Sequence, residues 1–210
     1  NFLPHQCVVR HADDGRWCYT TSMTTVVGIQ GQDFVVLAAD SQITDGDSRI
    51  ISIQTPKIVQ IDDYLLAVTG ESRPGDILTF QWKPPKYRGE HPVDFMGAKV
   101  VPSMYKVFKE NGYELPLNDK DTTFQYLISF NAYLFSVGDD LSFNCSERGI
   151  FTAGSGGNYA LGYLYSLRQK NFRTSLLSTV AAERAIEIAS ILDINTCPPI
   201  QSEVQYRKVK

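Results

Sequence analysis

The chain has 210 residues, of which 43% are hydrophobic and 20% are charged, so it can bury the core of one ordinary domain. Its formal net charge of −3 offers no basic excess for nucleic acid. No apolar run approaches the roughly 20 residues of a membrane-spanning helix. Four scattered cysteines without a CxxC pair and only three histidines predict no metal site and no disulfide-built fold, which fits a reducing cytoplasm. We therefore expect a cytoplasmic protein with neither a nucleic-acid nor a membrane partner.

Residues 1–23 differ from the rest of the chain because they show no sustained period of 2 or 3.6 residues. They also lack the apolar core of a secretory signal. We interpret them as a leader or propeptide, or as a segment added artificially, and we place one domain at residues 24–210.

The first half of this domain predicts two β-hairpins and then two helices. The β-branched and apolar runs TTVVGIQ and FVVLAA are joined by GQD, and KIVQI and YLLAV are joined by two aspartates. The segment ITDGDSRIISIQTP between the hairpins is interpreted as a loop. A region marked by proline and glycine brackets a short helix near 75–82 and precedes a longer helix near 93–110.

The second half repeats this order of strands and then helices. The runs FQYLISF, AYLFSV and LSFNC predict strands, and NYALGYLYSLRQ predicts a helix. A second helix is expected over 175–192, followed by a last strand in SEVQYRKV. The apolar stripe expected to bury the second helix consists of Leu177, Ala181, Ala185, Ile188 and Leu192.

Helices that come in pairs argue against a doubly wound parallel sheet, in which single helices alternate with strands. Two antiparallel sheets packed face to face, with a helical pair on each outer face, would cover every apolar surface. The sequence therefore predicts an α+β fold of four layers, an αββα sandwich.

Familiar catalytic motifs are weak in this sequence. GSGG at 154–157 follows a strand and precedes a helix, so its backbone N–H groups can face an anion. It lacks the P-loop lysine, the GxGxxG pattern and the GxSxG of a nucleophile elbow. A Ser-His-Asp triad has little support, because His5 and His11 lie in the leader and His91 lies beside Pro92.

Several ordinary features together resemble one family. Taken alone, Thr24 is an ordinary strand residue, Asp40 an ordinary residue at a strand end, and Lys57 an ordinary solvent-exposed lysine at the edge of a sheet. The segment TTVVGIQGQDFVVLAADSQIT, however, resembles the opening of proteasome β-subunits and of the related bacterial HslV peptidase. Asp40 lies 16 positions after Thr24, which is the family spacing. KIVQI supplies the family lysine as Lys57, one position late, and a one-residue insertion in the preceding loop explains the difference.

The resemblance continues to the end of the chain and covers about residues 24–210. LLAVTG matches the strand that leads to the family's oxyanion glycine, here Gly70. GSGGNYALGYL is similar to the family's junction of GSG and helix, with Ser155. AIEIASILDINT matches the segment that carries a supporting aspartate and a hydroxyl residue, here Asp193 and Thr196.

This resemblance implies the fold and chemistry of an N-terminal-nucleophile hydrolase. A threonine hydroxyl needs a base, and an α-amino group with a pKa of about 7.7–8 can serve as that base. Thr24 is therefore competent only as the first residue. Lys57, held by Asp40, would favour the developing alkoxide, and the Gly70 N–H would stabilise the oxyanion. The residues expected to position the amine are Ser155, Asp193 and Thr196.

The resemblance also implies a function and partners. We expect a threonine endopeptidase subunit of a self-compartmentalised protease, a homo-oligomeric ring or stacked rings that degrade unfolded polypeptides. An ATP-driven unfoldase would feed the chamber, and no metal or organic cofactor is implied. The pocket for the residue before the cut is carried over to Ile43, Thr55 and Val68, none of which is charged.

The residue before Thr24 leaves alternatives open. Met23 stands where proteasome precursors usually carry glycine. The leader is either a propeptide removed by autocatalysis, or Met23 is the true initiator and an aminopeptidase removes it, in which case residues 1–22 are artificial or follow a mis-set start. If neither cleavage occurs, the chain is a catalytically silent ring or scaffold subunit. A small-molecule amidase of the wider class is a further alternative, although VVLAAD and GSGG are typical of the proteasome branch.

Overall fold

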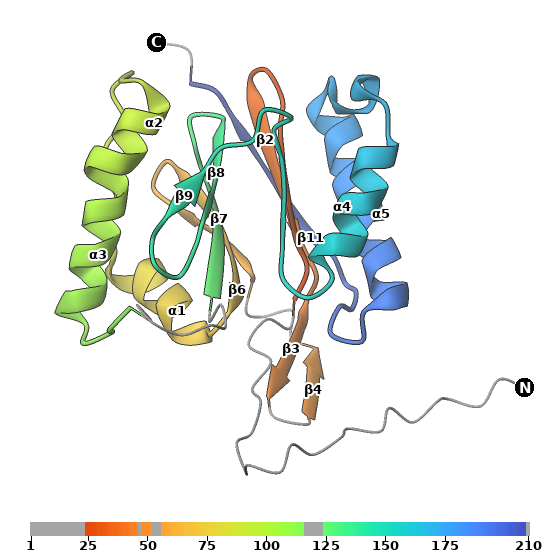
Figure 1. Ribbon diagram of the computed structural model, residues 1–210, viewed down its shortest axis with the longest axis horizontal. Helices are drawn as coiled ribbons and strands as arrows, with labels where there is room; N and C mark the ends of the chain where they lie inside the picture. The colour runs from red at the N-terminus through yellow and green to blue at the C-terminus, as the bar shows by residue number, and fades with distance from the viewer. Residues whose placement is uncertain (1–23, 46–47, 52–55, 116–123, 209–210) are drawn as a thin grey trace, which may run out of the picture.

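The computed structural model describes residues 24–45, 48–51, 56–115 and 124–208. Two antiparallel sheets pack face to face, and helices cover the outer face of each (Figure 1). This arrangement confirms the predicted α+β fold and its four αββα layers. The expected leader at 1–23 and the expected pocket residue Thr55 lie outside the described residues.

The first sheet has the strand order β10-β1-β2-β11. Its strands are β1 (Val26–Gln30), β2 (Phe34–Ala39), β10 (Ile150–Ala153) and β11 (Gln201–Tyr206). The strands β1 and β2 form the first predicted hairpin. All six residues of β2 are buried, because one face of the strand meets the second sheet and the other meets a helix. Burial on both faces explains why FVVLAA is continuously apolar rather than alternating.

The second sheet has the order β5-β6-β7-β8-β9. The strands β5 (Ile58–Ile61) and β6 (Tyr64–Gly70) form the second predicted hairpin. The next three strands are β7 (Phe124–Phe130), β8 (Tyr133–Val137) and β9 (Phe143–Asn144). Strand β9 has two residues, fewer than LSFNC suggested, because only Phe143 and Asn144 pair with β8.

A third hairpin corrects the sequence analysis. The segment expected to be a loop contains β3 (Gln42–Asp45) and β4 (Ser48–Ile51), which pair with each other. This hairpin extends from the end of β2 beyond the sandwich (Figure 1). It has no strand neighbour in either main sheet, and its four-residue strands are too short for a clear alternating pattern.

Helices complete the outer layers. The second sheet is covered by α1 (Ser72–Gln81), α2 (Pro92–Phe95), the π-helical η1 (Met96–Val100) and α3 (Val101–Glu110). The expected long helix is therefore interrupted by a π segment just before Pro102, a residue without the N–H that a regular helical turn requires. The first sheet is covered by α4 (Gly157–Ser166), η2 (Gln169–Phe172) and α5 (Ser175–Leu192).

The buried face of α5 differs from the predicted stripe. Leu177 and Leu192 are exposed. The buried residues of α5 are mostly small: Ser178, Ala181, Ala182, Ala185, Ile186 and Ala189. Small side chains let the helix backbone approach α4 and β2 closely.

Among the described residues, no helix is both long and apolar enough to cross a membrane, and no group of three or more acidic, histidine or cysteine residues is arranged to hold a metal ion.

Candidate active site

Thr24 lies two residues before β1 begins at Val26. Its side chain is buried, and its Oγ1 accepts a hydrogen bond from Lys57 Nζ at 2.8 Å. The backbone packs tightly here, because a methyl group at Gly154 would lie 1.9 Å from the Thr24 carbonyl oxygen. Gly154 also has a φ of 89°, which favours glycine.

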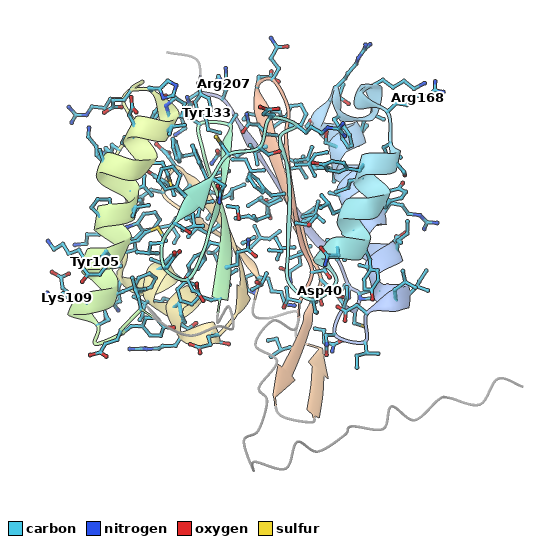
Figure 2. The ribbon with its side chains drawn as sticks, viewed as in Figure 1. Asp40, Tyr105, Lys109, Tyr133, Arg168 and Arg207 are labelled. Atoms are coloured by element: carbon cyan, nitrogen blue, oxygen red, sulfur yellow. The ribbon has the colours of Figure 1, made fainter. Side chains whose placement is uncertain are left out.

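Asp40 directly follows β2 and has no exposed surface. Figure 2 shows Asp40 at the end of the sandwich from which the β3–β4 hairpin extends. Its Oδ1 accepts from the Thr25 N–H at 2.9 Å, and its Oδ2 accepts from the N–H groups of Gln42 and Cys197 at 3.0 and 3.2 Å. Three backbone donors hold the carboxylate in one orientation, so it offers a fixed negative charge.

Lys57 directly precedes β5 and points its ammonium between Asp40 and Thr24. The distance from Nζ to Asp40 Oδ1 is 2.7 Å, and the Lys57 side chain is 10% exposed. Burial lowers the pKa of Lys57, while the charge of Asp40 and the hydrogen bond to it oppose that shift. The structure thus brings the three residues Thr24, Asp40 and Lys57 into one chain of contacts.

A second chain of contacts connects the three residues expected to position an amine. Asp193 ends α5, and its Oδ2 accepts from Ser155 Oγ at 2.8 Å and from Thr196 Oγ1 at 2.6 Å. The Asn195 N–H donates to Asp193 Oδ1 at 3.2 Å. Two hydroxyls and an amide thus fix the Asp193 carboxylate.

Thr25 joins the two chains of contacts, a role that the sequence analysis did not assign. Its N–H binds Asp40, and its Oγ1 lies 2.6 Å from Thr196 Oγ1. Because Thr196 donates its hydroxyl proton to Asp193, the Thr25 hydroxyl is the donor to Thr196. Gly156 leaves room for this contact, since a methyl group there would lie 2.0 Å from Thr25 Oγ1.

The predicted residues Gly70, Val68 and Ile43 lie among the described residues and take no part in the side-chain contacts described above. Gly70 ends β6 with a φ of 89°, a conformation that glycine adopts without strain. Val68, two residues earlier, donates its N–H to the Lys57 carbonyl at 3.2 Å. Because backbone N–H groups alternate sides along a strand, the Gly70 N–H faces the same side, beyond the end of β5. Ile43 is half-buried on β3.

Known proteins resemble this chain in sequence and fold. A family model described as proteasome subunit matches residues 21–79. The ATP-dependent protease subunit HslV of Caldanaerobacter subterraneus subsp. tengcongensis is 27% identical over 177 residues, which cover 82% of this chain and 93% of that protein. The structure of Thiobacillus denitrificans BPH covers 89% of this chain and all of its own, with 22% identity and a TM-score of 0.71. These matches in sequence and fold support a proteasome β-subunit or HslV-type family for the chain.

The same matches support the fold of a proteasome-type protease subunit for this chain. A structure of the same Thiobacillus protein in complex with epoxomicin superimposes with a TM-score of 0.71 at 20% identity, covering 89% of this chain and all of its own. At such identity the likeness concerns the fold.

Two polar residues of the site were missed because their partners are distant in sequence. Thr25 was visible only as the second residue of a double threonine. Gln201, which contacts Lys57, lies 144 positions away from it.

Proposed function

We propose that this chain, once Thr24 is its first residue, is a threonine endopeptidase subunit that hydrolyses unfolded polypeptides. The observation that carries the proposal is the contact of Lys57 Nζ with both Thr24 Oγ1 and Asp40 Oδ1, at 2.8 and 2.7 Å. A buried lysine paired with a fixed carboxylate and aimed at one hydroxyl suits the activation of that hydroxyl.

In the first step, the Thr24 oxygen attacks the carbonyl carbon of the scissile peptide bond. The α-amine of Thr24 takes the hydroxyl proton and passes it to the leaving nitrogen as the peptide bond breaks. The Lys57 ammonium favours the negative charge on the attacking oxygen and keeps the nearby amine neutral. Asp40, which no solvent reaches, keeps Lys57 charged against the effect of burial.

The oxyanion of the tetrahedral intermediate needs a donor of its own. The position of the Gly70 N–H beyond the last rung between β5 and β6 supports its role as this donor. Such donors are typically worth about 2.7–4 kcal/mol. The step leaves an acyl ester on Thr24, and water then hydrolyses the ester and regenerates the hydroxyl.

The amine needs neighbours that hold it in place. The hydroxyls of Ser155 and Thr196 both donate to Asp193 Oδ2, so their lone pairs and the remaining carboxylate oxygen can accept hydrogen bonds from an ammonium or water. Gly154 packs against the Thr24 carbonyl, which puts the neighbouring Ser155 next to the first residue of the processed chain.

Thr24 follows Met23 in the sequence, so its nitrogen is an amide until residues 1–23 are removed. We include that removal in the proposal. In an autocatalytic route, Thr24 Oγ1 attacks the Met23 carbonyl, the acyl group moves from nitrogen to oxygen, and water releases the leader as a carboxylic acid. The second candidate, a silent ring or scaffold subunit, is favoured by Met23 in place of the usual glycine.

The proposed partners follow from the family. The Caldanaerobacter relative is named an ATP-dependent protease subunit, which supports an ATP-driven unfoldase as the source of substrate. A homo-oligomeric ring or stacked rings would enclose the site. For the substrate pocket we propose Ile43 and Val68 together with Thr55. Val68 is half-buried and packs against Gly75 of α1, which supports an apolar wall beside Lys57.

Mass spectrometry and covalent labelling test the proposal together. The purified protein should contain a chain that begins at Thr24, and epoxomicin should add one inhibitor mass to that residue. The Thr24→Ala variant should take up none, whereas Thr174→Ala, which alters an exposed threonine before α5, should be labelled normally. A chain that always retains residue 23 would establish the silent subunit instead, and labelling that survives Thr24→Ala would disprove the role of Thr24.

A further inference from the structure

The core between the two sheets is an apolar layer, and its side chains give no directional restraint. The buried residues between them are apolar: Val26, Val35, Leu37, Ala39, Ile58, Leu65, Ala67, Leu127, Leu134 and Ala153. Hydrophobic contact is non-directional, so this layer alone does not set how the sheets are aligned. The ion pair of Asp40 and Lys57 depends on that alignment, because Asp40 follows β2 of the first sheet and Lys57 precedes β5 of the second.

Gln201 connects the two sheets at this ion pair. Its Oε1 accepts from the Lys57 N–H at 3.1 Å, and its Nε2 donates to Ser41 Oγ at 3.1 Å. Gln201 is the first residue of β11 and pairs with Ala39, the residue before Asp40. One amide side chain therefore contacts Lys57 and the neighbour of Asp40 at the same time.

The backbone of Lys57 is held from two directions. Its carbonyl accepts from the Val68 N–H on β6, and its N–H donates to Gln201. Lys57 lies just before β5 begins at Ile58, so its N–H is fixed by a side chain instead of a strand neighbour. These two hydrogen bonds fix the position of the Lys57 backbone, from which its side chain extends.

We propose that Gln201 is a positioning residue, which acts through the backbone of Lys57 to hold the ammonium between Asp40 and Thr24. This inference rests on the proposed function of Lys57. A misplacement of about 1 Å at a catalytic group can lower the rate about 100-fold. The directional contacts of Gln201 supply, next to Lys57, a restraint that the apolar layer lacks.

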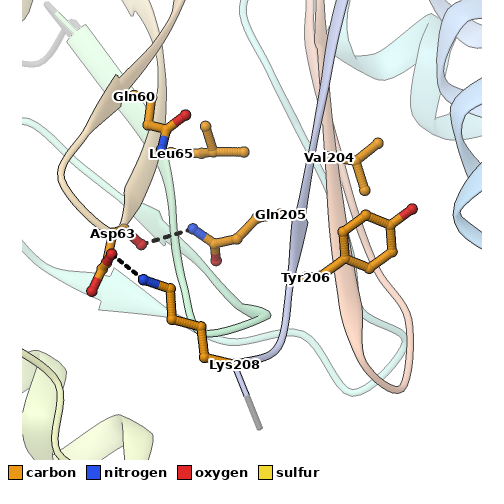
Figure 3. Close-up of a pocket in the computed structure, with 7 residues that line it drawn as sticks. All are labelled: Gln60, Asp63, Leu65, Val204, Gln205, Tyr206 and Lys208. Carbon is orange, nitrogen blue, oxygen red and sulfur yellow. Dashed lines mark hydrogen bonds and ion pairs between the residues drawn. The ribbon is translucent and has the colours of Figure 1, made fainter.

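Gln205 provides a matched control on the same strand. It lies four residues after Gln201, so both side chains point to the same face of β11. Its Nε2 donates to the Asp63 carbonyl at 2.9 Å, and its Oε1 accepts from the Ala132 N–H and Ser129 Oγ at 3.1 and 3.0 Å. Figure 3 shows Gln205 with Asp63 beside a pocket of about 190 Å³. Gln205 thus also bridges the sheets, but through Asp63, Ala132 and Ser129 rather than through Lys57.

The experiment compares four variants of the processed protein. Gln201→Met and Gln205→Met each replace the amide by an apolar chain of similar length, so urea unfolding should report a loss of stability for both. Only Gln201→Met should lower kcat for a fluorogenic peptide, about 10- to 100-fold, with KM within about twofold. Gln201→Glu keeps the acceptor for Lys57 and should recover most of the lost kcat. Gln201→Asn keeps the amide group but is one methylene shorter, so its kcat should fall about tenfold. This variant still tests the inference if Gln201→Met does not fold.

Equal kcat values for the Gln201 and Gln205 variants would overturn the inference, as would a Gln201→Glu variant no faster than Gln201→Asn. Either result would assign Gln201 a purely structural role. Both results leave the proposed function intact when the parent protein hydrolyses the peptide and Lys57→Ala does not. An inactive parent protein that begins at Thr24 would instead refute the proposed function, and with it the role of Gln201.

Discussion

Lys57 and Asp40 form an ion pair that crosses from one sheet of the sandwich to the other, with 2.7 Å between Nζ and Oδ1. Asp40 has three further backbone donors, whereas Lys57 Nζ also contacts Thr24 Oγ1. The carboxylate is therefore anchored by the fold, and the lysine is the member of the pair that faces the proposed nucleophile.

Replacing Lys57 by alanine should nearly abolish peptide hydrolysis while the protein still folds. The backbone donors continue to stabilise Asp40, and the lost charge acts on the transition state. A loss of about 2.7–4 kcal/mol corresponds to a 100- to 1000-fold lower kcat. The control is Lys109→Ala, which alters an exposed lysine on α3 (Figure 2). A Lys57→Ala variant that keeps more than about a tenth of the parent rate would show that the lysine is not needed.

Replacing Asp40 by asparagine should move the alkaline limb of the kcat/KM profile to lower pH. Burial already lowers the pKa of Lys57 from its ordinary 10.5, and Asp40 raises it. Without that charge the pKa of Lys57 falls further, so the lysine loses its proton earlier as the pH rises. A pH series with one fluorogenic peptide measures the shift. An alkaline limb that stays at the same pH or moves to higher pH would contradict the proposed need for a charged Lys57.

Adding a methyl group at Gly156 should damage both stability and activity. A Cβ there would lie 2.0 Å from Thr25 Oγ1 and 2.7 Å from Thr196 Oγ1, so the hydroxyls must separate. Overpacking of this kind costs about 1–3 kcal/mol, which urea unfolding of Gly156→Ala would measure. The matched control is Gly162→Ala on α4, where a Cβ meets no atom within 4 Å and helix propensity favours alanine by about 1 kcal/mol. An equal free energy of unfolding for Gly156→Ala and Gly162→Ala would refute the tight packing at Gly156.

Removing the hydroxyl of Tyr126 should stabilise the protein by about 1 kcal/mol at pH 7, because this buried oxygen has no hydrogen-bond partner among the described residues. Burial, with a contribution from Tyr113, raises the pKa of Tyr126 well above its ordinary value. Above about pH 10 the unfolded tyrosine loses its proton while the folded one keeps it, so stability falls as the pH rises.

The Tyr126→Phe variant should therefore lose less stability than the parent between about pH 10 and 11. Chemical unfolding at several pH values measures the difference. Tyr159→Phe, at a half-exposed position of α4, should behave like the parent protein. An identical alkaline loss in Tyr126→Phe and the parent would disprove this origin of the pH dependence.

Cleavage should favour large apolar side chains before the cut. Neither Ile43 nor Val68 carries a charge, and an apolar pocket discriminates by buried area at about 25 cal/mol per Å². Leucine, phenylalanine or tyrosine should therefore be preferred over alanine by about 10- to 100-fold. A panel of fluorogenic peptides that differ at this one residue tests the pocket. Preference for arginine or glutamate would refute the pocket assignment and leave the chemistry of Thr24 untouched.

The sequence predicted those parts of the fold that carry a strong local pattern. The hairpin of β1 and β2 follows from two β-branched runs and a short turn, and α5 begins and ends where the helical period does. The face of α5 was misjudged because its core side is built from small residues such as Ser178 and Ala182. Hydropathy gives these residues little weight, although close backbone packing requires them.

The site was predictable only where a family pattern marks it. The family spacing pointed to Thr24, Asp40 and Lys57, and Lys57 contacts the other two in the structure. The bridging contacts of Thr25 and Gln201 depend on how two sheets and a helix end meet in space. A side chain that hydrogen-bonds across such a distance leaves no period and no spacing in the sequence, so it could not be inferred before the fold was known.

The two hydroxyls that join the contacts of the site, on Thr25 and Thr196, are 171 positions apart in the chain. During synthesis from the N-terminus, Thr24, Asp40 and Lys57 are made long before Asp193. Strand β2 also lacks its neighbour β11 until residues 201–206 have left the ribosome. A nascent chain therefore holds an unfinished set of the groups proposed for catalysis, and the order of translation itself would delay the proposed activity until the domain is whole.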